Sequence, residues 1–67
     1  MTDVAQLEYF IKKAQITKRQ IAKELCISET ALYNKLNNNA EFKASEIVKM
    51  QEILKLTNDE RDKIFFD

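Results

Sequence analysis

The chain has 67 residues, 45% of which are hydrophobic, and its eleven basic and eleven acidic side chains give a formal net charge of zero. A chain of this size forms one domain, residues 1–67, and buries only about 60% of the surface that its unfolded form exposes, so its own core is small. Gly and Pro are both absent, which favours an all-α fold over a sandwich or barrel, whose many turns need these residues.

A single Cys and the absence of His restrict the chemistry open to the chain. One Cys cannot form an intramolecular disulfide, and no His is present to activate it as a nucleophile. The sequence also lacks a zinc-ligand set, an Asp-x-Asp calcium loop and a glycine-rich phosphate loop. We therefore expect a protein that is not an enzyme and that has no metal, no cofactor and no small-molecule effector.

No segment is apolar enough to suggest a membrane protein. The sequence contains no run of eighteen apolar residues, and no apolar signal region follows Met1. The lone Cys agrees with a reducing compartment, so we expect a cytoplasmic protein without a membrane partner.

The neutral total hides an uneven distribution of charge. Residues 12–49 carry eight basic and four acidic side chains, a net charge of +4, whereas residues 1–11 and 50–67 each carry a net charge of −2. A local basic cluster is the electrostatic footprint of many nucleic-acid-binding proteins. The same cluster is also compatible with an ordinary solvated surface.

The first predicted helix runs from Thr2 or Asp3 to about Ala14. Asp3 and Gln6 have the spacing of a loose capping box. Its apolar residues fall on one stripe that we expect to face the core: Val4, Leu7, Phe10, Ile11 and Ala14.

The run from Ile16 to Leu36 contains two short helical patterns with a hinge at Cys26 and Ile27. Each pattern places its apolar residues on one face: Ile21, Ala22 and Leu25 in the first, and Leu32 and Leu36 in the second. Two helices on such a hinge can form a helix-turn-helix, whose second helix lies in the major groove of DNA. Periodicity alone fits two core helices of a small bundle equally well.

Several motifs carry a resemblance to a known family. They are TKRQIA (residues 17–22), Ile27-Ser28, LYNKLNN (residues 32–38), Glu41-Phe42 and SEI (residues 45–47). At this spacing the sequence resembles the lambda-repressor-like or XRE-type regulators, and in particular the small Cro-like proteins of prophages from Gram-positive bacteria. The resemblance covers roughly residues 4 to 66. It implies a compact five-helix DNA-binding domain in which helices 2 and 3 form the helix-turn-helix.

Two positions depart from the pattern of the resembled family. A glycine usually occupies the position of Cys26, because the backbone there favours positive φ, and we expect Cys26 to be a small buried packing residue. An apolar core residue often occupies the position of Lys35. We expect Lys35 to lay its stem on the core and to send its ammonium toward the DNA backbone.

The first turn of the second helix carries two cations, Lys18 and Arg19. Thr17 and Gln20 can form a capping box there, but cations at a helix N-terminus oppose the helix dipole. The placement is favourable if the N-terminus meets a phosphate, so we predict phosphate contacts for Lys18 and Arg19. The alternative is again a solvated surface.

The third helix begins after Ser28, which is a good N-cap. Side chains in the first turns of a recognition helix meet base edges, so the predicted base-reading residues are Glu29, Thr30, Tyr33 and Asn34. The predicted phosphate contacts outside the second helix are Ser28, Lys35, Asn37 and Lys43. No Arg occurs on this helix, so the commonest guanine contact is missing and we expect a preference for A·T pairs.

The remaining chain is predicted to contain a loop and two helices. The run Asn37-Asn38-Asn39 can end the third helix, because Asn enters the left-handed region more readily than most residues, and Phe42 then enters the core. The fourth helix runs from Lys43 or Ala44 to Leu56, and the fifth from Asn58 to about Phe65. The fourth helix buries Ile47, Met50, Ile53 or Leu54, and Val48, and Thr57 with Glu60 caps the fifth.

Three large apolar residues, Ile64, Phe65 and Phe66, end an acidic segment. One or two of them can close the core. Phe65 and Phe66 are predicted to form a homodimer interface, at least on DNA, with all three packing inside the monomer as the alternative. Together these patterns predict a transcriptional regulator that occupies a double-stranded DNA operator. The alternative is a protein-interaction module or antitoxin-like component with the same fold.

Overall fold

Most of the helices start where the sequence supplies a side-chain acceptor. In the computed structural model, which describes residues 1–66, four of the five helix N-caps accept a hydrogen bond from the backbone three residues later. These N-caps are Asp3, Thr17, Ser28 and Thr57. In return, the side chain of Gln20 accepts from the backbone N–H of Thr17 at 2.9 Å, and that of Glu60 accepts from the backbone N–H of Thr57 at 2.8 Å. A cap of this kind stabilises a helix by about 1 kcal/mol.

The resulting elements are five α-helices, and no strand occurs among residues 1–66. They are α1 (Val4–Ala14), α2 (Lys18–Leu25), α3 (Glu29–Leu36), α4 (Ala44–Leu54) and α5 (Asn58–Phe65). The all-α class and the five helices expected from the sequence are therefore confirmed. None of these helices combines the length and the apolar character needed to cross a membrane.

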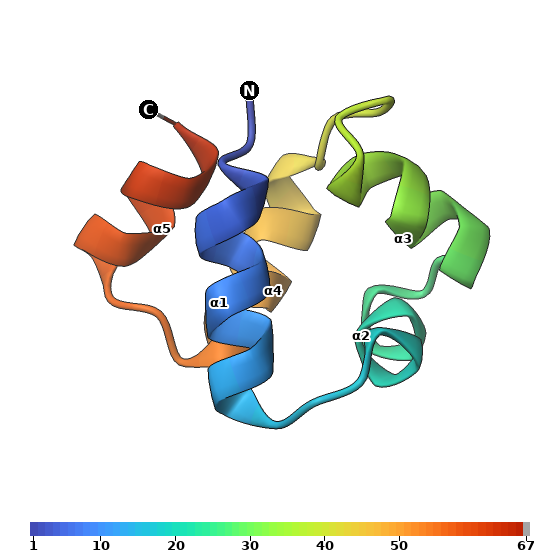
Figure 1. Cartoon of the computed structure of the whole chain (residues 1–67), viewed down its shortest axis with the longest axis horizontal. Coiled ribbons are helices and arrows are strands. Elements are labelled where there is room, and N and C mark those ends of the chain that lie inside the picture. The colour runs from blue at the N-terminus through green and yellow to red at the C-terminus, as the bar shows by residue number, and fades with distance from the viewer. Residues whose placement is uncertain (67) are drawn as a thin grey trace.

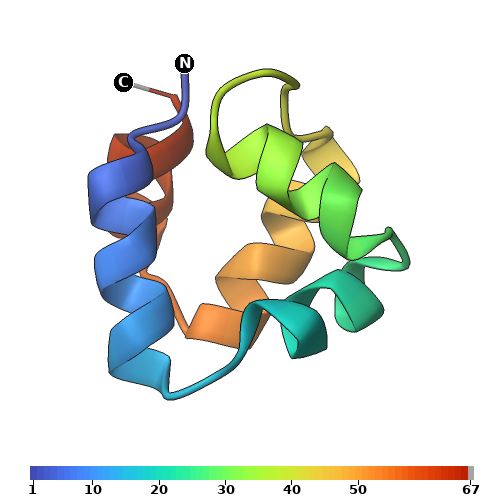
Figure 2. The ribbon, with the colours of Figure 1, turned by 45° about the vertical axis from the view of Figure 1, so that its right-hand side comes forward.

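One hydrophobic core joins all five helices. Each helix contributes one completely buried side chain, and these are Leu7, Ile21, Leu32, Met50 and Ile64. Helix α4 packs against α1, α2 and α5, and Figures 1 and 2 show it between the α1–α5 pair and the α2–α3 pair. The α2–α3 pair therefore forms one side of the molecule, with α4 as its support.

The first and last helices are joined where the chain ends come together. The backbone N–H of Asp3 donates to the carbonyl oxygen of Ile64 at 2.7 Å, and both termini lie at the same end of the molecule in Figure 1. Asn38 also donates a side-chain hydrogen bond to the carbonyl of Thr2, at 3.4 Å. The N-terminal segment thus contacts both α5 and the loop that follows α3.

Four residues that are not glycine adopt the left-handed conformation with φ between 55° and 60°: Gln15, Cys26, Asn38 and Lys55. The chain has no glycine, so each of these turns forces a Cβ into a region that costs roughly 1–2 kcal/mol. Asn38 confirms the prediction that the Asn run ends α3. Cys26 has the positive φ of the glycine that it replaces in the resembled family, but its side chain is exposed. The expectation of a buried Cys26 was wrong because this turn directs the side chain away from the core.

The structure also corrects three details of the predicted helices. Ala14 is exposed, and so is Val48, with 55% of its surface accessible. Helix α4 ends at Leu54 rather than at Leu56, because Lys55 turns left-handed and the backbone N–H of Leu56 bonds back to Gln51. Leu56 is nevertheless buried, so it serves the core from outside the helix.

Candidate functional site

The turn between α2 and α3 is short and tightly hydrogen-bonded. It consists of residues 26–28, and the backbone N–H of Ile27 donates to the carbonyl of Ala22 at 3.0 Å. Ala22 is almost completely buried, and its small side chain lets the two helices approach. Ser28 then caps α3 by accepting from the N–H of Ala31 at 3.0 Å. The turn, the Ser28 cap and the packing at Ala22 together hold α3 against α2.

The two faces of α3 differ sharply in exposure. Leu32 and Leu36 point into the core, as predicted. The polar residues predicted to read bases lie together on the opposite, solvent-exposed side: Glu29, Thr30, Tyr33 and Asn34. Asn37 follows the helix and is also exposed. The outer face of α3 thus offers a carboxylate, two hydroxyls and an amide to a partner.

Lys18 links the start of α2 to both neighbouring helices. Its Nζ lies 3.0 Å from Oε2 of Glu8 in α1 and 5.7 Å from the ring centroid of Tyr33 in α3. Both charged side chains remain about one-third exposed or more, and an ion pair of this kind stabilises a fold by about 1 kcal/mol at most. The pair is therefore weak enough for an external anion to compete for the Lys18 ammonium.

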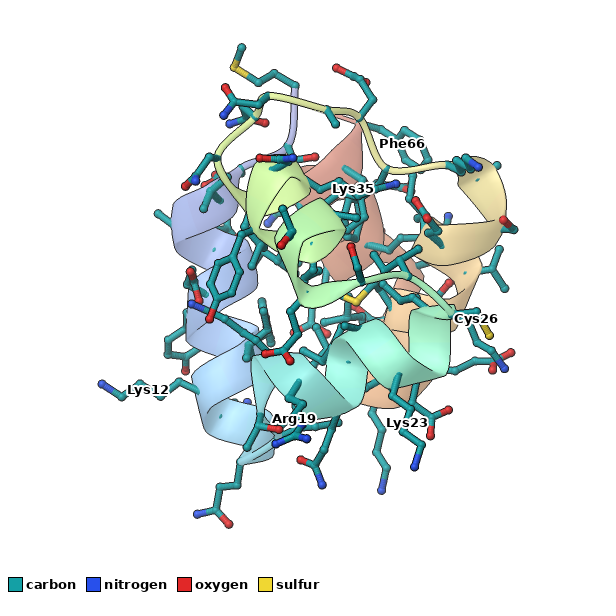
Figure 3. The ribbon with its side chains drawn as sticks, turned by 90° about the vertical axis from the view of Figure 1, so that its right-hand side faces the viewer. Lys12, Arg19, Lys23, Cys26, Lys35 and Phe66 are labelled. Carbon is teal, nitrogen blue, oxygen red and sulfur yellow. The ribbon has the colours of Figure 1, made fainter. Side chains whose placement is uncertain are left out.

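Other cations extend freely around the same surface. Arg19 and Lys23 are exposed on α2 and Lys12 on α1, and Figure 3 shows Lys12 and Lys23 extending away from the body of the molecule. A groove of about 440 Å³ lies where α2 meets the start of α3, and Arg19, Lys23 and Ser28 contribute to its lining. Lys12 and Lys23 were not among the predicted site residues, although their sequence positions in the basic middle of the chain suggested them.

Lys35 does not lie on this surface, so the predicted phosphate contact of its ammonium is wrong. Its side chain is buried, with Nζ 2.5 Å from Oε1 of Glu46 in α4. Nζ also donates to the backbone carbonyl of Glu41 at 3.4 Å and lies 5.8 Å from the centroid of the Phe42 ring. Figure 3 shows Lys35 beside α3, on the side that faces α4. The reason is its register, since Lys35 shares the inward face of α3 with Leu32 and Leu36.

Glu46 is held as a carboxylate despite its burial. Burial raises its pKa, but the hydrogen bonds from Lys35 and from the backbone N–H of Lys43, together with the positive charges of these lysines, outweigh burial and lower the pKa below its usual value. The N–H of Lys43 donates to Oε1 of Glu46 at 2.8 Å, while the Lys43 side chain stays exposed at the start of α4. The same carboxylate oxygen therefore serves as the partner of Lys35 and as the cap of α4.

Sequence reasoning missed Glu46, although two signals were present. Glu46 stands three residues after the residue that precedes α4, which is the capping-box spacing. Lys35 lies on an inward helix face, where a buried lysine needs an acidic partner if its ammonium does not reach solvent. Glu8 was missed for a different reason. Its contact with Lys18 joins two helices, and no local spacing predicts such a contact.

The two aromatic residues predicted for a dimer interface have different environments. Phe65 is buried and packs edge-to-face on Phe42 with 5.4 Å between ring centroids. It is part of the monomer core, so its assignment to an interface between subunits was wrong. Phe66 is 64% exposed and has no such partner among the aromatic contacts of residues 1–66.

Comparisons with known proteins identify a family without a described activity. Residues 2–67 match the family model described as "Protein of unknown function (DUF739)". No curated protein and no solved structure matches the chain.

Proposed function

The chain belongs to the DUF739 family, whose function is unknown. We propose that this member binds double-stranded DNA in a sequence-specific manner and regulates transcription. In this proposal α2 and α3 form a helix-turn-helix like that of the lambda-repressor-like proteins, which the sequence resembles. Helix α3 lies in the major groove, and the start of α2 contacts the DNA backbone.

One observation carries the proposal: the outer face of α3 exposes four side chains that can form hydrogen bonds, Glu29, Thr30, Tyr33 and Asn34, while its inner face is buried. These side chains lie next to the exposed cations of α2, so hydrogen-bonding groups and positive charge share one side of the molecule. An α-helix fits the width of the major groove, where each base pair shows a distinct pattern of donors and acceptors. The exposed face of α3 therefore has the chemistry for reading base edges.

Three of the exposed side chains of α3 have a preferred contact with a base. The Asn34 amide can make two hydrogen bonds to the edge of an adenine, and the methyl group of Thr30 can contact the methyl group of thymine. Glu29 can accept a hydrogen bond from cytosine, and it also disfavours DNA sites that would place a phosphate against it. Since α3 has no Arg, the preferred sites are rich in A·T pairs.

The cations of α2 supply affinity that does not depend on sequence. Arg19 is exposed, and the Lys18 ammonium can exchange its weak pair with Glu8 for a phosphate. Ser28, Asn37 and Lys43 are exposed at the edges of α3 and α4 and contact flanking phosphates. The protein acts by occupying an operator and excluding polymerase, so regulation follows from occupancy and not from catalysis.

Selection of bound sequences from random duplex DNA tests this proposal. The expected result is enrichment of one A·T-rich motif, and a near-palindromic motif indicates that two copies bind. The affinity for that motif falls linearly with the logarithm of the salt concentration, with a slope of about −0.9 per phosphate contacted. Uniformly G·C-rich half-sites contradict the assigned base contacts. Failure to enrich any sequence, with no salt-dependent DNA affinity, favours the protein-interaction alternative.

A further inference from the structure

The ion pair between Lys35 and Glu46 joins three segments of the chain through hydrogen bonds. Oε1 of Glu46 in α4 accepts from Nζ of Lys35 in α3 and from the backbone N–H of Lys43. Nζ of Lys35 also donates to the carbonyl of Glu41 in the loop between α3 and α4. Helix α3, this loop and the start of α4 thus share one hydrogen-bonded junction.

This pair differs from the other ion pairs of residues 1–66. The side chains of Lys35 and Glu46 are only 10% and 7% exposed, whereas those of Lys18 and Glu8 are 32% and 40% exposed. The pair of Arg61 with the neighbouring Asp62 is more exposed as well. Buried ion pairs often add little stability compared with apolar residues, but they tolerate displacement poorly because a separated charge has no solvent.

The junction lies directly beneath residues that face outward on α3. Asn34 precedes Lys35 in the chain, and its carbonyl accepts the backbone N–H of Asn39 at 2.8 Å. The carbonyl of Lys35 accepts the N–H of Asn38 at 3.2 Å. These two bonds close the C-terminal turn of α3, and the Lys35 ammonium ties this turn to the loop before α4 and to α4 itself. Without the ion pair, the turn would therefore open more often. Purely apolar contacts, such as those of Leu36, have no comparable directional requirement.

We propose that Lys35 and Glu46 are positioning residues, and that their buried ion pair sets the placement of the C-terminal half of α3 so that Asn34 and Asn37 meet the DNA correctly. The proposal rests on the proposed function for its effect on DNA. The pair itself makes no contact with DNA. Its contribution is to sequence discrimination more than to stability.

The double variant Lys35→Met/Glu46→Gln removes both charges, together with the hydrogen bonds of the Lys35 ammonium to Glu46 and to the Glu41 carbonyl. Met retains the apolar stem next to Phe42, and the Gln oxygen can still accept the N–H of Lys43. We expect this variant to fold with a thermal midpoint close to that of the wild type. Glu46→Asp is a second variant, which keeps the charge but shortens the side chain and so separates the pair.

Two measurements test the positioning role. The first is hydrogen exchange at the Asn39 amide, which we expect to be about tenfold faster in the double variant, with the Ile11 amide in α1 unchanged. The second is the ratio of affinities for the duplex selected by the wild type and for a scrambled duplex of equal composition. We expect this ratio to fall about tenfold, the discrimination supplied by one good base contact, while the affinity for the scrambled duplex is retained.

The controls separate positioning from a general loss of charge or stability. Arg61→Gln/Asp62→Asn removes a surface ion pair from α5 and should change neither measurement. The single variant Lys35→Arg retains the cation, so its ratio of affinities for the selected and the scrambled duplex should equal that of the wild type. Wild-type values of both measurements in the double variant and in Glu46→Asp would overturn the positioning role. If the wild type selects no DNA sequence, the proposed function fails, and the Asn39 exchange rate still decides whether the pair holds α3 in place.

Discussion

At the scale of single residues, Cys26 shows how the chain turns sharply without glycine. It ends α2 with φ at 58° and ψ at 39°, and its side chain is exposed. The exposed thiol contributes little packing, so its Cβ mainly adds strain at this position. The turn depends on the backbone bonds of residues 26 and 27 to Lys23 and Ala22, which any residue can make.

Replacing Cys26 with Gly should therefore stabilise the fold. We expect Cys26→Gly to raise the free energy of unfolding by about 0.5–1 kcal/mol, because relief of the strain exceeds the added freedom of the unfolded chain. Chemical denaturation at neutral pH measures the change. Cys26→Ala is the matched control, because it removes the sulfur, keeps the strained Cβ and should leave stability nearly unchanged. Equal stability of all three proteins would show that the turn is not strained.

Glu46 should contribute to the pH dependence of stability. Because its pKa is lower in the folded protein than in the unfolded chain, its contribution is fully present above the ordinary pKa of a glutamate side chain. The contribution is lost as the pH falls from that value through the folded pKa. The charged groups facing Glu46 are Lys35 from α3 and Lys43 at the start of α4.

Denaturation of the wild type and of Glu46→Gln from pH 7 to pH 3 tests this effect. The variant should be the less stable protein at pH 7, and the difference should shrink as the pH falls through the ordinary pKa of a glutamate side chain and below it. Carboxylates elsewhere in the chain titrate in both proteins, so they cancel in the comparison. A difference that stays constant down to pH 3 would contradict the lowered pKa of Glu46.

The direction and burial of single side chains were the hardest features of the site to predict from sequence. The outward placement of Thr30, Tyr33 and Asn34 followed from the periodicity of α3 and is correct as to exposure. The direction of the Lys35 ammonium did not follow, because a lysine stem can carry its charge either to solvent or to a buried acid. That choice depends on Glu46, which a tertiary contact brings to it.

At the scale of elements, the proposed function assigns different tasks to α2 and α3. The cations at the start of α2 contact phosphates, which are the same in every DNA sequence. The polar face of α3 contacts base edges, which differ between sequences. Substitutions in the two helices should therefore affect DNA binding in different ways.

Lys18→Ala and Asn34→Ala test this division of tasks. Lys18→Ala should weaken binding to all duplexes and reduce the slope of log affinity against log salt by about 1. Asn34→Ala should lower affinity for the selected duplex by about 1–3 kcal/mol and relax the preference at one base position. Titrations at several salt concentrations measure both effects. Lys63→Ala is the control, because Lys63 is equally basic but lies on α5. If Lys63→Ala lowered DNA affinity and the salt slope as much as Lys18→Ala, the phosphate contact assigned to Lys18 would be contradicted.

Helix starts were predictable because they depend on neighbours three residues apart. The caps at Thr17, Ser28 and Thr57 were expected from that spacing and are present. The end of α4 was predicted too late. Leu54 and Leu56 are both buried, and residues two apart cannot share one face of a helix, so the chain must leave the helix between them. That requirement becomes visible only when both residues are known to be buried.

At the scale of the whole molecule, the exposed Phe66 is the strongest candidate for contact between two copies. Phe65 already completes the core against Phe42. The two adjacent Phe residues alone did not show that Phe65 would be buried within the single chain. Phe66 presents a large apolar surface beside it. A two-fold dimer that buries Phe66 would separate its recognition helices by about 34 Å when they occupy successive major grooves.

Sedimentation of the wild type and of Phe66→Ser tests dimerisation. The wild type should show a mass that rises with protein concentration, and Phe66→Ser should remain a monomer with nearly unchanged stability, because the lost side chain is exposed. Val48→Ser is the control, since Val48 is also exposed but lies on α4. A wild type that remains monomeric at the highest soluble concentration, without DNA, would remove the dimer proposal.

The hydrogen bond between Asp3 and Ile64 has a consequence for the order of folding. Bringing α1 and α5 together closes a loop of almost the whole chain, whereas α2 and α3 are joined by only residues 26–28. The entropy lost on closing a loop grows with its length, so local pairs form before distant ones. We therefore expect the α2–α3 pair to be structured in the folding transition state and the junction of the chain ends to form last. The part of the protein assigned to DNA would then assemble first, and the closure of α1 on α5 would complete the native state.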